Sequence, residues 1–228
     1  MPARKAQPKA PARKRILLVE DHALLRRGLK TLIETEPNLA VCAEADTRQG
    51  GLDAIAASKP DLVIADLSLK DSDGLQMIKD IKRRFPRLPV LALSMYEEGI
   101  YAERALRAGA RGYVTKQELD GTVLIAIRRV LAGEIHTSEA MSKKFAQKFL
   151  GGGTLEKGAG LASLSDRELE VFKLIGRGKT TREIAQLLRL SVKTIESHKE
   201  HLKVKLQLSS GTEIVRRATL WVETGRMN

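Results

Sequence analysis

Five short apolar runs alternate with longer amphipathic stretches through the first 133 residues. The runs are RILLVE (15–20), AVCAEA (40–45), DLVIAD (61–66), LPVLALS (88–94) and GYVT (112–115). The stretches between and after them place apolar residues at helical spacing and cover 23–34, 47–58, 74–85, 98–109 and 118–133. Strict alternation of strands and helices with short connections predicts an α/β domain, a parallel sheet covered by helices on both faces.

The carboxyl ends of these predicted strands carry charged and hydroxyl side chains, namely Glu20, Asp21, Asp66, Ser94 and Lys116. Ligands of parallel sheets gather outside the carboxyl ends of the strands, so we expect these side chains to converge. Converging carboxylates repel one another unless a cation joins them, and Mg²⁺ is the natural partner of such oxygen ligands. With Lys116 as a fixed positive charge, the set suits phosphoryl transfer in which one carboxylate attacks.

Residues 15–133 resemble the receiver domain of bacterial two-component response regulators, and we expect a receiver domain over 15–136. The motifs that carry the resemblance are VEDH (19–22), ADLSLKDSDG (65–74), ALSMYE (92–97) and GYVTK (112–116). The resemblance implies a flavodoxin-like, five-stranded, doubly wound fold and makes Asp66 the residue phosphorylated by a histidine kinase. The apolar run DLVIAD (61–66) would then end in the charged residue Asp66 because its carboxylate is the nucleophile.

The same resemblance assigns roles to the remaining residues of this edge. It implies that Asp21 binds Mg²⁺ directly, that Glu20 binds it through water, and that Asp66 and the backbone carbonyl of Ser68 complete the protein ligands. Lys116 would neutralise the phosphoryl group. Ser94, in the motif ALSMYE, and Tyr113, in the motif GYVTK, would form the switch pair: the serine hydroxyl turns toward the phosphoryl group and the tyrosine ring follows inward.

From Leu164 onward only helical periodicity is present. Ser165 stands at capping-box spacing before Glu168, and TTREIAQLL (180–188) predicts a short helix. A tight turn, RLS (189–191), leads into a longer helix capped by Ser191. This order of a short helix, a turn and a capped helix predicts a small all-α helix-turn-helix domain over 164–228. Apolar residues at 195, 202 and 206 share one side of the longer helix, which we expect to face the core.

This segment resembles the LuxR-type helix-turn-helix of NarL/FixJ response regulators through LSDRELEV (164–171), TTREIAQLL (180–188), LSVKTIESH (190–198) and VKLQL (204–208). The resemblance implies binding to double-stranded DNA and pairing of two subunits through the final helix (212–225). It places at the bases Lys193, Glu196, Ser197 and Glu200, and at the phosphates Thr181, Thr194, Lys199 and Lys203. His198 and His201 could indicate a metal, but with no cysteine near and a core position implied for His198, we expect packing.

The distribution of charge agrees with a polyanion-binding end. The net charge is +12, and 164–228 carries 13 basic against 8 acidic residues. The tail 1–14 is basic, without apolar periodicity, and is expected to be disordered. Segment 137–163 starts like a helix and becomes Gly-rich, which predicts a linker. No signal peptide or membrane span of about 20 apolar residues is evident, so we expect a cytoplasmic protein without membrane contact.

These observations favour a DNA-binding transcriptional regulator of a two-component system, switched by phosphorylation of Asp66, and not a turnover enzyme. One alternative is a pseudo-receiver that binds DNA regardless of phosphorylation. A second is an aspartyl-phosphate phosphatase, which also uses an Asp nucleophile, Mg²⁺ and a Lys. Against it, Ser68 stands two residues beyond Asp66, where a second acidic group would be needed as general acid.

Overall fold

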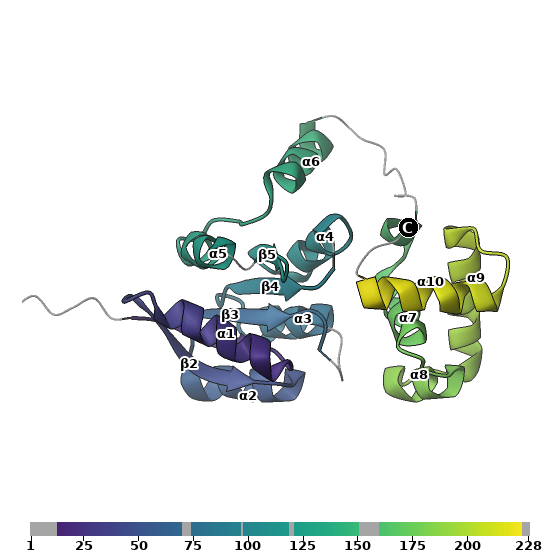
Figure 1. The fold of residues 1–228 in the computed structure, drawn as a ribbon, viewed down its shortest axis with the longest axis horizontal. Coiled ribbons are helices and arrows are strands. Elements are labelled where there is room, and N and C mark those ends of the chain that lie inside the picture. The colour runs from purple at the N-terminus through teal and green to yellow at the C-terminus, as the bar shows by residue number, and fades with distance from the viewer. Residues whose placement is uncertain (1–12, 70–73, 97, 119–120, 151–159, 225–228) are drawn as a thin grey trace, which may run out of the picture.

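The computed structural model describes residues 13–69, 74–96, 98–118, 121–150 and 160–224. Its N-terminal part contains one parallel sheet with the strand order β2-β1-β3-β4-β5 (Figure 1). The strands are β1 (Lys14–Val19), β2 (Leu39–Ala45), β3 (Leu62–Asp66), β4 (Val90–Ser94) and β5 (Gly112–Thr115). The predicted sheet is confirmed. Strand β1 begins at Lys14, one residue inside the segment expected to be a disordered tail, and residues 1–12 lie outside the described part.

Helices cover both faces of this sheet. One face packs against α1 (Ala23–Glu34) and α5 (Thr122–Leu131), and the other packs against α2 (Arg48–Ser58), α3 (Gly74–Arg84) and α4 (Glu98–Ala108). Successive side chains of β1 point to opposite faces of the sheet. Ile16 packs in the apolar cluster under α1 and α5, and Leu17 packs in the cluster under α2, α3 and α4. A strand buried on both faces reads as a continuous apolar run, which is the pattern present in the sequence.

The C-terminal part is helical. It follows the connecting helix α6 (Glu139–Leu150) and contains a 3-10 turn η1 (Gly160–Ser163), α7 (Asp166–Gly176), α8 (Thr181–Leu188), α9 (Val192–Leu206) and α10 (Gly211–Thr224). The predicted capping box is present at α7, where the Ser165 hydroxyl accepts from the Glu168 amide and the Glu168 carboxylate accepts from the Ser165 amide. Ser191 caps α9 as predicted, and Arg189 closes α8 with a left-handed backbone (φ 52°). The helix-turn-helix is therefore confirmed.

The segment between the two parts starts with α6, in agreement with the predicted helical start. Its Gly-rich stretch, 151–159, lies outside the described residues. Among the helices that the structure describes, none has both the length and the apolar character to span a membrane. The buried side chains of α7–α10 form one cluster with those of α3 and α4, so the two parts share a continuous core.

Candidate functional site

The carboxyl edge of the sheet brings Glu20, Asp66 and Lys116 together. Asp66 is the last residue of β3, and Glu20 directly follows the neighbouring strand β1. Lys116, directly after β5, reaches both carboxylates: its Nζ lies 2.7 Å from Glu20 Oε2 and 3.0 Å from Asp66 Oδ2. The Lys116 amide also donates to the Ser94 carbonyl (2.7 Å), which anchors it to the end of β4. The parallel topology thus assembles the residues that the sequence separates by almost 100 positions.

The charge balance of this edge is unfavourable without a further cation. Burial raises the pKa of Asp66, and the ammonium of Lys116 offsets that effect only in part. Burial also raises the pKa of Glu20, and the nearby charge of Asp66 adds to the increase. One ammonium does not balance the negative charge of two buried carboxylates, so a further cation at this edge would be stabilising.

The donor set of this edge suits Mg²⁺. Carboxylate oxygens of Glu20, Asp21 and Asp66 lie within 4.8 Å of one another. Glu20 and Asp66 are buried, whereas Asp21 is half-buried and leaves a side open to solvent. The Ser68 amide holds Asp66 Oδ1 at 2.8 Å, so the second oxygen of Asp66 faces Lys116. Hard oxygen ligands beside a solvent-accessible side match the coordination that Mg²⁺ prefers, so these residues fit the ion.

Ser94 and Tyr113 both bind the backbone of Tyr96. The Ser94 hydroxyl accepts from the Tyr96 amide (3.0 Å), and the Tyr113 hydroxyl donates to the Tyr96 carbonyl (2.7 Å). The side chains of all three residues are buried. The predicted switch pair is thus joined through a residue that the sequence analysis did not single out.

The face of α9 expected to contact DNA bases is exposed. Ile195, Leu202 and Leu206 are buried as predicted. The opposite side exposes Lys193, Glu196, Ser197 and Glu200. The phosphate-contact candidates are half-buried around it: Thr181, Thr194, Lys199 and Lys203. Both lysines of this set pair with acidic residues of the exposed face, at 3.2 Å for Lys199–Glu196 and 2.7 Å for Lys203–Glu200.

Comparisons with known protein families decide the family. Residues 16–128 match the response regulator receiver domain, and residues 162–218 match the bacterial regulatory proteins of the luxR family. The chain is 33% identical over 208 residues to the oxygen regulatory protein NreC of Staphylococcus haemolyticus, covering 90% of this chain and 96% of that protein. This chain is a response regulator of the NarL/FixJ type.

Solved structures agree with this assignment. The response regulator is similar to RcsB from Salmonella enterica serovar Typhimurium bound to the promoter rprA with phosphomimetic BeF3⁻, at 26% identity and a TM-score of 0.70, over 90% of this chain and 97% of RcsB. It is also similar to a LuxR-family response regulator from Aurantimonas sp. SI85-9A1, at 32% identity and a TM-score of 0.56, over 61% and 99% of the two chains. The family consists of DNA-binding regulators and not of turnover enzymes, so the phosphatase alternative is set aside.

The helix-turn-helix domain of the regulator docks on the receiver beside Asp66. Lys173 Nζ donates to the Leu67 carbonyl (3.1 Å), and the Arg177 guanidinium donates to the Ser68 carbonyl (3.0 Å). Both donors come from the C-terminal half of α7 and its cap. The backbone that directly follows the phosphoacceptor candidate therefore holds the DNA-binding domain.

An aromatic stack continues this interface. The Trp221 ring of α10 is fully buried and stacks on Tyr96, with ring centroids 4.4 Å apart and planes inclined by 17°. Tyr101 of α4 stacks on the ring of Tyr96, with ring centroids 4.9 Å apart. Phe172 of α7 contacts Trp221 with ring centroids 5.7 Å apart. Tyr96 thus touches the switch pair through its backbone and the DNA-binding domain through its ring.

Ion pairs close the rim of the interface. Asp166 at the start of α7 pairs with Lys79 of α3 (2.8 Å) and with Arg104 of α4 (2.9 Å). Sequence reasoning found none of these docking residues, because their partners lie about 60 to 130 positions away and no local pattern marks them. The final helix (212–225) was expected from the family resemblance to pair two subunits, and its Trp221 contacts the receiver instead.

Proposed function

We propose that phosphorylation of Asp66 by a sensor histidine kinase switches this regulator from a docked state to one that binds double-stranded DNA. The observation that supports the proposal is the pair of hydrogen bonds from Lys173 and Arg177 to the carbonyls of Leu67 and Ser68. A covalent change at Asp66 acts on the same loop that holds the DNA-binding domain. Such a loop is a two-state element that phosphorylation can bias.

The residues at the carboxyl edge of the sheet, here called the acidic edge (Glu20, Asp21, Asp66 and Lys116), have distinct proposed roles in phosphoryl transfer. The Asp66 carboxylate attacks the phosphorus of a phosphohistidine; a new O–P bond forms, and the N–P bond breaks and returns its electron pair to the imidazole. Lys116 neutralises negative charge on the phosphoryl oxygens. Asp21, Asp66 and the Ser68 carbonyl would hold Mg²⁺, with Glu20 behind a water. The bound ion supplies positive charge against the phosphoryl oxygens.

The switch pair links this chemistry to the interface. If the Ser94 hydroxyl turns to a phosphoryl oxygen, it gives up the hydrogen bond with the Tyr96 amide. Tyr113 then follows, because its hydroxyl is bonded to the carbonyl of the same residue. The ring of Tyr96 carries the Trp221 stack, so this movement loosens the contact between α10 and the receiver.

The released domain is proposed to bind DNA as a homodimer. The base-facing candidates are Lys193, Glu196, Ser197 and Glu200 on the exposed side of α9, as a recognition helix requires. Val215 and Leu220 of α10 are large apolar side chains that are 49% and 42% exposed, which fits pairing of two such helices. The RcsB neighbour is bound to promoter DNA in the presence of a phosphomimetic, which supports DNA binding by the phosphorylated form.

Fluorescence anisotropy on the DNA upstream of the gene in its host tests the proposal. The titration is made with full-length protein and Mg²⁺, with and without acetyl phosphate, on wild type, Asp66→Asn and Asp53→Asn. Asp53 is an exposed residue of α2 and provides a matched control. Acetyl phosphate should strengthen binding at least about tenfold, or about 1.4 kcal/mol, in wild type and Asp53→Asn but not in Asp66→Asn.

Equal binding with and without the phosphodonor would overturn the switch and favour the pseudo-receiver, in which the acidic edge is only structural. A response of equal size in Asp66→Asn would place the phosphorylation elsewhere. Size-exclusion chromatography of the same samples should show the dimer only in the samples that respond.

A further inference from the structure

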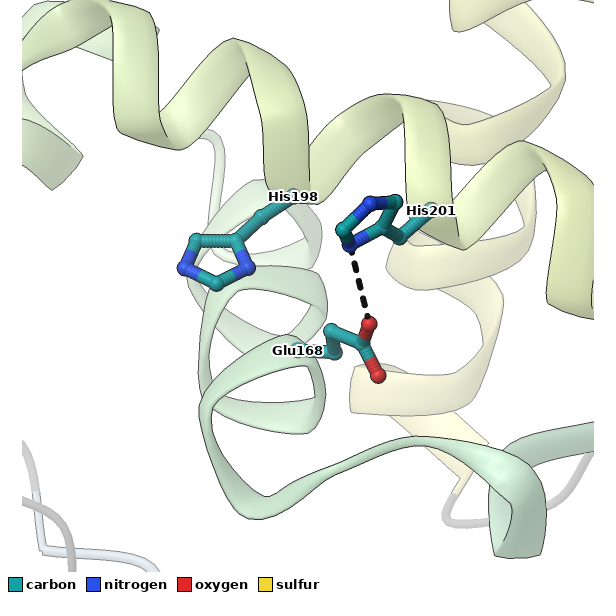
Figure 2. A group of neighbouring side chains, drawn as sticks. All are labelled: Glu168, His198 and His201. Carbon is teal, nitrogen blue, oxygen red and sulfur yellow. Dashed lines mark ion pairs between the residues drawn. The ribbon is translucent and has the colours of Figure 1, made fainter.

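Three nitrogen and oxygen donors converge between α7 and α9, far from the acidic edge of the receiver. Figure 2 shows His198 and His201 on α9 turned toward Glu168 on α7. His201 Nδ1 lies 3.4 Å from Glu168 Oε1, and donor atoms of all three residues lie within 4.8 Å of one another. The sequence did not predict a metal at the two histidines, and Glu168 stands at least 30 positions away, so only the fold brings it to them.

His198 carries a buried nitrogen whose bonding capacity is unused. Its Nδ1 has no hydrogen-bond partner among the residues that the structure describes. A buried polar atom without a partner costs about 1–3 kcal/mol, so such atoms call for an explanation. Imidazole nitrogen is a common ligand of divalent metal ions, so a bound cation would satisfy this atom.

Glu168 is fixed in place by bonds to one of its oxygens. Oε2 accepts from Lys205 Nζ (2.6 Å) and from the Ser165 amide (2.7 Å). These bonds orient the carboxylate, and its Oε1 points to His201. These outer bonds play the part that supporting hydrogen bonds play for the ligands of metal sites.

We propose that Glu168, His198 and His201 form a binding site for Zn²⁺ or a similar first-row divalent cation. Two imidazoles and one carboxylate are a ligand set of zinc proteins, with further positions taken by water. Mg²⁺ prefers oxygen ligands only and does not compete for this set. The site is spatially separate from the phosphorylation switch, because none of its residues belongs to the acidic edge or to the hydrogen bonds and ion pairs between the domains described above.

The consequence of binding is a clamp between two helices. Glu168 lies in the first turn of α7, and both histidines lie in the middle of α9, the candidate recognition helix. A cation bound to all three would join these helices at a point where His198 Nδ1 has no hydrogen-bond partner among the described residues. Because the cation binds the folded arrangement and not the unfolded chain, it should raise the melting temperature of the protein.

Cobalt absorption of the full-length protein tests the site. Co²⁺ replaces Zn²⁺ in such sites and gives visible absorption bands when bound by imidazole. The titration is made with excess Mg²⁺, which occupies the acidic edge of the receiver. The test variant is His201→Ala, because His201 is 63% exposed and its loss leaves the fold intact. The control is His22→Ala, an exposed histidine that follows the acidic pair of the receiver.

Wild type and His22→Ala should give saturable bands that Zn²⁺ displaces, and Zn²⁺ should raise the melting temperature of both. His201→Ala should lose at least about tenfold in zinc affinity by calorimetry, as expected for loss of one of three ligands, and should show a smaller zinc-dependent melting shift than wild type at the same zinc concentration. Unchanged zinc affinity in His201→Ala would overturn the proposal. Loss of the bands in His22→Ala would overturn it as well, since the cation would then sit at the receiver.

Discussion

Removing the Arg177 guanidinium tests whether docking of the DNA-binding domain opposes Mg²⁺ binding. Arg177 donates to the Ser68 carbonyl, which is also the backbone oxygen proposed to bind the ion. A guanidinium and a divalent cation at one carbonyl oxygen repel each other, so the docked state should bind Mg²⁺ more weakly than the undocked state. Arg177→Ala should therefore loosen the docked domain and strengthen Mg²⁺ binding.

The size of the effect follows from the lost contacts. A hydrogen bond from a charged donor contributes about 1.5–3 kcal/mol, and the bond to Ser68 has a length of 3.0 Å. A second contact, to the Leu69 carbonyl, is 3.4 Å long and adds little. At about 1.4 kcal/mol for each factor of ten, the undocking constant should rise about 10- to 150-fold. The Mg²⁺ midpoint should fall by up to the same factor, because the competent state becomes more populated.

The protein contains its own reporter for this measurement. Trp221 is the single tryptophan of the chain and is buried against Tyr96 in the docked state. Undocking uncovers one face of the ring, so its emission should shift to the red as Mg²⁺ is added. Arg182→Ala, which changes an exposed arginine of α8, is the matched control and should behave like wild type. An identical emission spectrum and Mg²⁺ midpoint in Arg177→Ala would refute the competition.

Three further predictions concern stability, each measured by urea unfolding of the full-length protein. Asp66→Asn should raise the free energy of unfolding by roughly 0.5–2 kcal/mol at neutral pH, because it removes one of the two buried carboxylates that share the Lys116 ammonium. Burial raises the folded-state pKa of Asp66, so wild-type stability should fall as the pH rises from the ordinary aspartate range through the raised value. Asp66→Asn should lack this pH-dependent loss of stability. An identical pH profile in the two proteins would contradict the raised pKa of Asp66. Gly74→Ala should cost about 1–3 kcal/mol by overpacking, since a Cβ there would lie 2.3 Å from the Leu67 Cα. Gly28→Ala, inside α1 with nothing within 4 Å of the added carbon, should instead stabilise by about 0.5–1 kcal/mol.

Local patterns in the sequence determined the fold of each part and the acidic edge. Apolar runs of strand length alternating with helical stretches allow few arrangements other than a parallel sheet. Once the strands are parallel, their carboxyl ends lie at one edge, and this places Asp66 beside Glu20 and within reach of Lys116. Caps such as Ser165 and Ser191 were also readable, because a cap depends only on residues three positions apart.

Only the tertiary structure decided how the two domains meet. The stack of Trp221 on Tyr96 and the bond from Arg177 to the Ser68 carbonyl join residues more than 100 positions apart. Nothing in a local stretch encodes such a pair, because its formation depends on the relative placement of two bodies that each fold by their own periodicity. The same holds for Glu168, whose place beside His198 and His201 follows from the packing of α7 against α9 and not from any spacing in the chain.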